Sequence, residues 1–227
     1  MNRSKMPKFL RAAALAAAVS LAPVAWADDF GSDLRDGQWV QWIYSIPTSV
    51  NPMIDDTGQN CMVGQNGSTW YLAPLSVWEG GEASRSCTIP QGVKLQFAVA
   101  GATYVYAPGF CGDVAGTSDR DLRAAIAGFT DTLRVNVTLD GERVSAKRLR
   151  SEVFATALPA DNLFALSCDD GPGSVPAGIY RTVDDTYYAE IENLRPGVHT
   201  LRLVATDGSS FHQNVVYTLN VVPRLRR

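Results

Sequence analysis

The chain has 227 residues, 46% of them hydrophobic, and its formal net charge is −3. This length is enough for one domain with a core of its own. Acidic residues outnumber basic ones and are spread along the sequence, which argues against nucleic acid or an anionic membrane surface as the partner.

A secretory signal is predicted at residues 1–27. Basic residues and no acidic one precede an apolar run from Ala12 to Val24, and the small-x-small motif Ala25-Trp26-Ala27 follows. The run is shorter than the roughly 20 apolar residues of a membrane span. We therefore expect cleavage after Ala27, a secreted or periplasmic location, and one domain at 28–227 that is not an integral membrane protein. An uncleaved N-terminal anchor is the rival interpretation.

Two short helices are predicted. Between Asp36 and Ile46, large apolar residues recur at the spacing of one helix face, with Asp36 as the expected N-terminal cap and Pro47 as the end. In the run at 118–129, Ser118 is the expected cap, with Asp121 three residues later. The apolar stripe of this second helix consists of Leu122, Ala125, Ile126 and Phe129.

Apolar and polar residues alternate over much of the remaining chain, which is typical of strands with one buried face. The alternation covers residues 93–99, 133–139, 201–205 and 215–221. Asp140-Gly141 supplies the turn of a tight hairpin, and residues 207–210 form the turn between the last two strands. Because such strands need a second layer, we predict a mostly β fold: an antiparallel two-sheet sandwich, immunoglobulin-like or jelly-roll-like, with one or two short helices.

Two disulfides are predicted from Cys61, Cys87, Cys111 and Cys168, because an even number of cysteines in an oxidising compartment is typical of paired thiols. Three connectivities are open. We favour Cys61–Cys87 with Cys111–Cys168, since pairing sequence neighbours closes the smaller loops, although loop length alone is a weak criterion. A metal site is the rival interpretation, but the sequence lacks the C-x₂-C pairs of zinc sites.

The stretch QWIYSIPTSVNPMIDDTGQNCMVGQNGSTWYLAP, followed by SRSCTIPQG, resembles a family of uncharacterised secreted bacterial proteins. The shared pattern is W-x-x-S-I-P, N-P, T-G-x-x-C-x-x-G-Q-x-G-x-x-W-x-L and R-x-C-x-I-P-x-G. The segments LDGERV, LRSEVF, LPADNLF and LRPGVHTLRL are also similar to that family. One departure is Ala98, where members of the family tend to carry proline. The resemblance spans most of residues 28–227 and implies no particular activity.

Aromatic, amide and guanidinium side chains are concentrated between residues 60 and 87. We name Gln65, Trp70, Trp78 and Arg85 as candidate ligand-binding residues, because aromatic rings beside amide and guanidinium groups are typical of glycan or peptide recognition. We expect Gln65 to face outward on a glycine-containing turn and Arg85 to be held in place by the neighbouring disulfide. The rival interpretation is structural: tryptophans packed in the core, Arg85 in an internal contact and Gln65 capping a backbone turn.

No catalytic set is recognisable in the sequence. His199 and His212 are its two histidines, and it contains neither a G-x-S-x-G elbow nor an H-E-x-x-H motif. We expect no cofactor. Ca²⁺ at Asp55-Asp56-Thr57-Gly58 or Asp169-Asp170-Gly171 is an alternative, although such segments are above all turn signals. Further carboxylates available for a hydrolytic pair are Glu79, Asp113, Asp119 and Asp121.

The leading hypothesis is an exported, non-enzymatic domain that binds a glycan, a peptide or an envelope component. Two alternatives stay open. A secreted hydrolase would hold two carboxylates roughly 5–10 Å apart across a groove. A structural subunit of a surface assembly would present an unpaired edge strand or a large apolar patch.

Overall fold

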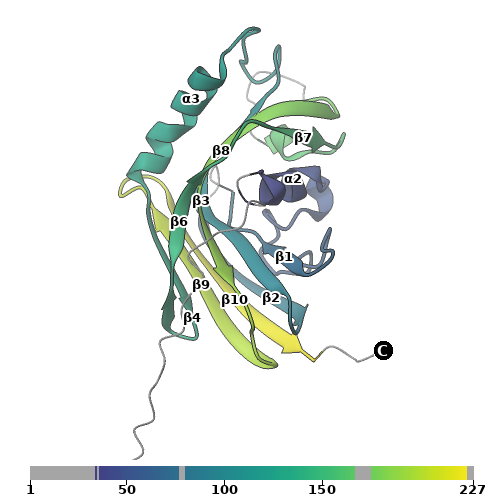
Figure 1. The fold of residues 1–227 in the computed structure, drawn as a ribbon, viewed down its shortest axis with the longest axis vertical. Coiled ribbons are helices and arrows are strands. Elements are labelled where there is room, and N and C mark those ends of the chain that lie inside the picture. Colours follow the sequence, from purple (N-terminus) through teal and green to yellow (C-terminus); the bar gives the residue numbers. More distant parts are fainter. Residues whose placement is uncertain (1–33, 35, 77–79, 167–174, 224–227) are drawn as a thin grey trace, which may run out of the picture.

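Two five-stranded sheets form the body of the protein (Figure 1). The computed structural model describes residues 34, 36–76, 80–166 and 175–223, so the predicted signal at 1–27 lies outside the described residues. Sheet A consists, in spatial order, of β1 (Thr69–Leu72), β3 (Lys94–Tyr106), β8 (Gly178–Ile191) and β6 (Ala146–Arg150), with β7 (Phe154–Leu158) also paired to β8. Sheet B consists, in spatial order, of β2 (Gly81–Pro90), β10 (His212–Val222), β9 (Gly197–Thr206), β4 (Arg134–Leu139) and β5 (Glu142–Val144).

The predicted two-sheet, mostly β fold is confirmed, but its purely antiparallel arrangement is wrong. β1 pairs parallel with β3, and β2 pairs parallel with β10, so each sheet contains a parallel pair. These pairs join strands whose order cannot be deduced from local alternation. The predicted hairpin at Asp140-Gly141 does form: both residues have positive φ, and β4 pairs antiparallel with β5 across them. The last two strands also pair antiparallel, as expected.

The main hydrophobic core lies between the two sheets. Phe97 of β3, Leu203 of β9 and Val215 of β10 are 0% exposed and belong to this core. The predicted Cys61–Cys87 disulfide is confirmed and lies in the same cluster. A bridge that closes a loop of this size stabilises a fold by about 3–4 kcal/mol, mainly through the unfolded state. Cys111 is also disulfide-bonded, and its predicted partner at position 168 lies outside the described residues.

Helices α2 (Gln38–Ser45) and α3 (Asp119–Thr132) cover opposite faces of sheet A. α2 packs with Tyr188 of β8, whereas α3 packs with Val183 of the same strand, and these two positions point to opposite faces. In Figure 1, α2 lies between β7 and β1, and α3 runs along the far side of β8. No helix among the described residues is long and apolar enough to cross a membrane. Short 3₁₀ helices occupy Thr48–Val50 and Leu163–Leu166.

The start of each helix shows which capping predictions hold. Ser118 caps α3 as predicted, because its side chain accepts a hydrogen bond from the backbone N–H of Asp121. The expectation that Asp36 caps α2 is wrong. The cap position is Gly37, whose φ is 74° and which has no side-chain cap. A Cβ at Gly37 would lie 2.5 Å from the Phe154 ring, so this glycine permits the close approach of α2 to β7.

A buried glutamine, Gln213, bridges β3 and the segment that follows β1. The pairing of β1 with β3 ends at Leu72, and the chain then moves away from β3. Gln213 of β10 accepts a hydrogen bond from the Leu75 N–H (3.2 Å) and donates one to the Val99 carbonyl. Beyond this bridge lies an apolar cavity of about 320 Å³. Its lining includes Trp39, Tyr44, Met53, Thr103, Phe129 and Thr186.

Candidate functional site

Arg85 points into the protein and not toward a ligand. The residue is 2% exposed. Its guanidinium donates hydrogen bonds to the carbonyl oxygens of Met53 (3.1 Å) and Ala73 (2.6 Å) and to the hydroxyl of Tyr217 (2.8 Å). The expectation that Arg85 is available on a binding surface is therefore wrong, because the residue is buried and both of its terminal amino groups hold neighbouring segments against sheet B.

Gln65 and Trp70 also make internal contacts. Gln65 is half-buried, and its amide donates to the carbonyls of Cys61 (3.0 Å) and Tyr71 (2.6 Å) and accepts from the Tyr71 N–H (2.9 Å). Gln65 thus ties the loop that precedes β1. Trp70 is 9% exposed and packs in the core between the sheets. Trp78, the fourth candidate, lies outside the described residues.

An open groove of about 770 Å³ lies beside the loop that Gln65 holds, and we call it the α2 groove. One wall is the outer side of α2, one is the loop at 64–68 with the start of β1, and the third is the exposed side of β7 with the start of β8. Its lining residues are Gln38, Gln41, Trp42, Ser45, Gly64, Asn66, Ser68, Thr69, Tyr71, Ala155, Ala157 and Ile179.

Two aromatic rings meet at the wall of the α2 groove: Tyr71 is half-buried, whereas Trp42 is only 7% exposed and belongs to the core cluster beneath the groove. The ring centres of Trp42 and Tyr71 are 5.3 Å apart, with their planes tilted by 35°. The Trp42 indole N–H donates to the Val63 carbonyl (3.1 Å), and the Tyr71 hydroxyl donates to the Gln38 side-chain oxygen (3.3 Å). A Cβ at Gly64 would lie 3.0 Å from the Trp42 ring nitrogen, so a small residue is needed there. The groove is therefore organised before any ligand arrives.

None of the twelve residues that line the α2 groove carries a formal charge. The polar lining consists of side-chain amides (Gln38, Gln41 and Asn66) and hydroxyls (Ser45, Ser68, Thr69 and Tyr71). Amides and hydroxyls both donate and accept hydrogen bonds, as sugar hydroxyls do. Apolar and aromatic groups beside a few directional polar groups are typical of ligand pockets in this size range. The arrangement suits a neutral, hydroxyl-rich ligand better than a charged one.

The sequence holds a signal for this groove that the motif analysis passes over. Gln38, Gln41 and Ser45 are spaced i, i+3 and i+7, so they form the polar side of the same helix whose apolar side was predicted. Asn66 and Tyr71 lie within the segment predicted to bind, directly beside the named candidates. Sequence reasoning therefore named a loop that borders this groove, but it chose residues that support the loop.

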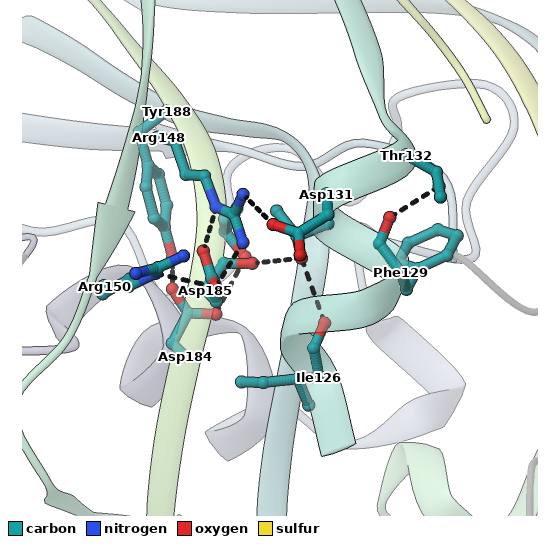
Figure 2. Close-up of polar contacts among 11 residues, drawn as sticks. Ile126, Phe129, Asp131, Thr132, Arg148, Arg150, Asp184, Asp185 and Tyr188 are labelled. Carbon is teal, nitrogen blue, oxygen red and sulfur yellow. Dashed lines mark hydrogen bonds and ion pairs between the residues drawn. The ribbon is translucent and has the colours of Figure 1, made fainter. Parts of the chain in front are cut away.

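A second polar cluster lies on the other side of sheet A, around neighbouring aspartates of β8 (Figure 2). Asp185 accepts hydrogen bonds from Arg148 Nε (2.6 Å) and Nη2 (2.7 Å) and from Arg150 Nε (3.2 Å). Arg148 also donates to Asp131 of α3 at 2.6 Å. The hydrogen bond to Asp185 is the main cause that raises the pKa of Arg148 above its usual value. This cluster fixes the C-terminal part of α3 against β6.

Asp184 points the opposite way, into the layer beneath α2. The residue is 2% exposed, and its carboxyl accepts from the hydroxyls of Thr103 (2.7 Å), Thr186 (2.9 Å) and Tyr188 (2.9 Å). Burial raises the pKa of Asp184 to about 6, because these hydrogen bonds only partly offset the loss of water around the charge. An acidic pair inside a strand of threonines and tyrosines was a sequence signal for a buried polar cluster.

Among the described residues, the arrangement of side chains does not support the catalytic or metal-binding alternatives. Both ring nitrogens of His199 are used, one by the Asp140 carboxylate (2.7 Å) and one by the Arg195 carbonyl (2.9 Å). No carboxylate lines the α2 groove. Asp55 accepts hydrogen bonds from Thr57 and from the Asn60 N–H. Burial alone would raise the Asp55 pKa, but these bonds outweigh it and lower the pKa. That segment is therefore a turn stabilised by its own backbone.

The structure also bears on the remaining metal-binding and hydrolytic candidates. Within the described residues, no group of three His, Cys, Asp or Glu side chains is arranged to hold a metal ion. The segment at 169–171, the other proposed Ca²⁺ site, lies outside them. The aspartates at 184 and 185 are adjacent in one strand and both line the pocket between α3 and β6, but Asp185 is paired with Arg148 and Asp184 is bonded to hydroxyls.

Comparison with known proteins adds little to this geometry. No protein-family model and no curated protein matches the chain. Among solved structures, it is similar to the "Solution Structure of Amebosin", with 12% identity over 63% of this chain and 98% of that chain and a TM-score of 0.23. A likeness at that TM-score supports no inference about fold or function.

Proposed function

We propose that the protein is an exported, non-enzymatic domain that binds a neutral glycan in the α2 groove. The observation that carries this proposal is the lining of the groove: amides, hydroxyls and the half-buried Tyr71 ring, backed by the buried Trp42, without a charged side chain. Sugar rings offer apolar faces that stack on aromatic groups and hydroxyls that form directional hydrogen bonds. The resemblance to secreted bacterial proteins supports a location where such glycans are met.

Paired amide variants test this proposal directly. We expect the purified protein to bind at least one neutral oligosaccharide on a glycan array. Replacing Gln41→Ala together with Asn66→Ala should weaken that binding at least tenfold in titration calorimetry, because two donor–acceptor groups leave the groove. The control is Gln59→Ala, an exposed glutamine in the turn before Cys61 that does not line the groove. Retention of full affinity in the double variant, or release of product from a polymer substrate, would refute the proposal.

The proposed export has its own test. Because the Ala25-x-Ala27 motif follows the apolar run, we expect N-terminal sequencing of protein recovered from outside the producing cells' cytoplasm to begin at Asp28. Replacing Ala27→Gln should slow processing, because a large side chain does not fit the small-residue position. A mature chain that still begins at Met1 would show that the segment acts as an anchor.

A further inference from the structure

Arginines gather around a pocket between α3 and β6. The pocket has a volume of about 280 Å³ and lies on the face of sheet A opposite to the α2 groove. Arg120 and Arg123 enter its lining from the first turns of α3, and Arg150 enters from the end of β6. Asp184 and Asp185 of β8 also belong to the lining, so three arginines and two aspartates line one small space.

The nearby carboxylates are already engaged. Both oxygens of Asp185 accept hydrogen bonds from Arg148, and one accepts from Arg150 as well, as Figure 2 shows. Asp131 is paired with Arg148. Asp184 is 2% exposed although it belongs to the lining, and its carboxyl is already bonded to three hydroxyls.

The arginines keep unused donors. Arg123 is half-buried and has no hydrogen bond or ion pair with any residue that the structure describes. Arg150 uses only its Nε, in the 3.2 Å contact with Asp185. Arg120 lies 3.9 Å from Asp121, and both side chains are largely exposed. The side chains of Arg120 and Arg150 are 93% and 62% exposed, so they border the mouth of the pocket, where a bound anion would offset the repulsion among like charges.

We propose that this pocket binds a phosphoryl group. Guanidinium groups that converge from two elements can each present a pair of N–H donors, which matches the several oxygens of a tetrahedral oxyanion better than the two oxygens of a carboxylate. The alanines at 124 and 127 leave room for the group beside the arginine stems. The site is independent of the α2 groove and would stand if the glycan proposal failed.

Phosphate titration tests the site. At constant ionic strength, inorganic phosphate should raise the melting temperature of the purified protein along a saturating curve, because it binds only the folded state. Arg123→Gln and Arg150→Gln should each weaken phosphate binding at least tenfold in calorimetry. The control is Arg143→Gln, an exposed arginine of β5, which should bind phosphate as the wild type does.

A second readout separates a binding role from a structural one. Without phosphate, Arg123→Gln should melt no earlier than the wild type, because the change removes neither a hydrogen bond nor an ion pair and keeps most of the half-buried stem. Glycerol 3-phosphate that binds more tightly than inorganic phosphate would identify a phosphorylated molecule as the source, and equal affinity would identify free phosphate. Acetate that binds as well as phosphate, a response that does not saturate, or an equal loss in Arg143→Gln would overturn the proposal.

Discussion

Replacing Arg85→Ala should lower the free energy of unfolding by about 3–5 kcal/mol, as removal of one member of a buried polar network does. The change leaves the carbonyl oxygen of Met53 buried without its donor, while the Ala73 carbonyl keeps only its hydrogen bond from the Tyr217 hydroxyl. It also removes the guanidinium, which lies 5.5 Å from the centre of the Tyr217 ring, and leaves a void. Urea unfolding followed by tryptophan fluorescence measures the loss.

Two companion variants make the Arg85 result interpretable. Arg85→Met fills most of the volume without donating, so it should recover only part of the loss. Arg143→Ala, at an exposed position, should change stability by less than about 0.5 kcal/mol. If Arg85→Ala left the unfolding midpoint unchanged but abolished ligand binding, Arg85 would be a recognition residue and the structural role would be refuted.

Replacing Asp184→Asn should raise the free energy of unfolding at neutral pH, whereas Arg85→Ala should lower it. Burial raises the folded-state pKa of this carboxyl to about 6 from 3.8, so the folded protein holds the proton more tightly than the unfolded chain. The stability that the protonated group confers is fully present below pH 4 and is lost as pH rises from 4 through 6. Above that window the charged carboxylate costs on the order of 3 kcal/mol, which the asparagine avoids.

The pH profile of unfolding is the measurement. The wild type should lose stability between pH 4 and 6 relative to Asp184→Asn, and the two curves should run parallel above pH 7. The groups that face this carboxyl are Thr103 of β3, Thr186 and Tyr188 of β8, and Tyr44 of α2. Asp56→Asn, at an exposed turn position, is the control. An Asp184→Asn protein less stable than the wild type at pH 8 would contradict the argument.

Local patterns in the sequence predicted the elements well and their assembly poorly. Alternation and a turn dipeptide are enough for the β4–β5 hairpin, because its partners are neighbours in the chain. The pairing of β2 with β10 joins residues 81–90 to 213–222, and no short-range pattern encodes it. The cap of α2 was missed for a different reason: Gly37 is set by its approach to Phe154, which only the tertiary structure reveals.

For the candidate site, too, the sequence predicted the region but not how its residues are assembled. The region between Thr57 and Cys87 was identified from its composition, but sequence reasoning took polar and aromatic residues there to face a ligand. Arg85 and Gln65 instead satisfy backbone carbonyls, since loops that are fixed near a core need internal donors. The groove depends on α2 and β7 lying beside that loop, and this depends on contacts distant in sequence.

The position of β10 determines when β2 gains its pairing partner during synthesis. Among the described residues, β10 is the strand that pairs with β2, and it separates β2 from β9. Synthesis proceeds from the N-terminus, so the edge of β2 stays open until residues 213–222 have emerged. An open strand edge invites pairing with other chains, and contacts so distant in sequence form slowly. Before β10 pairs, a holding chaperone would therefore limit association through this side of β2; the other side of β2 is unpaired among the described strands of the folded sheet as well.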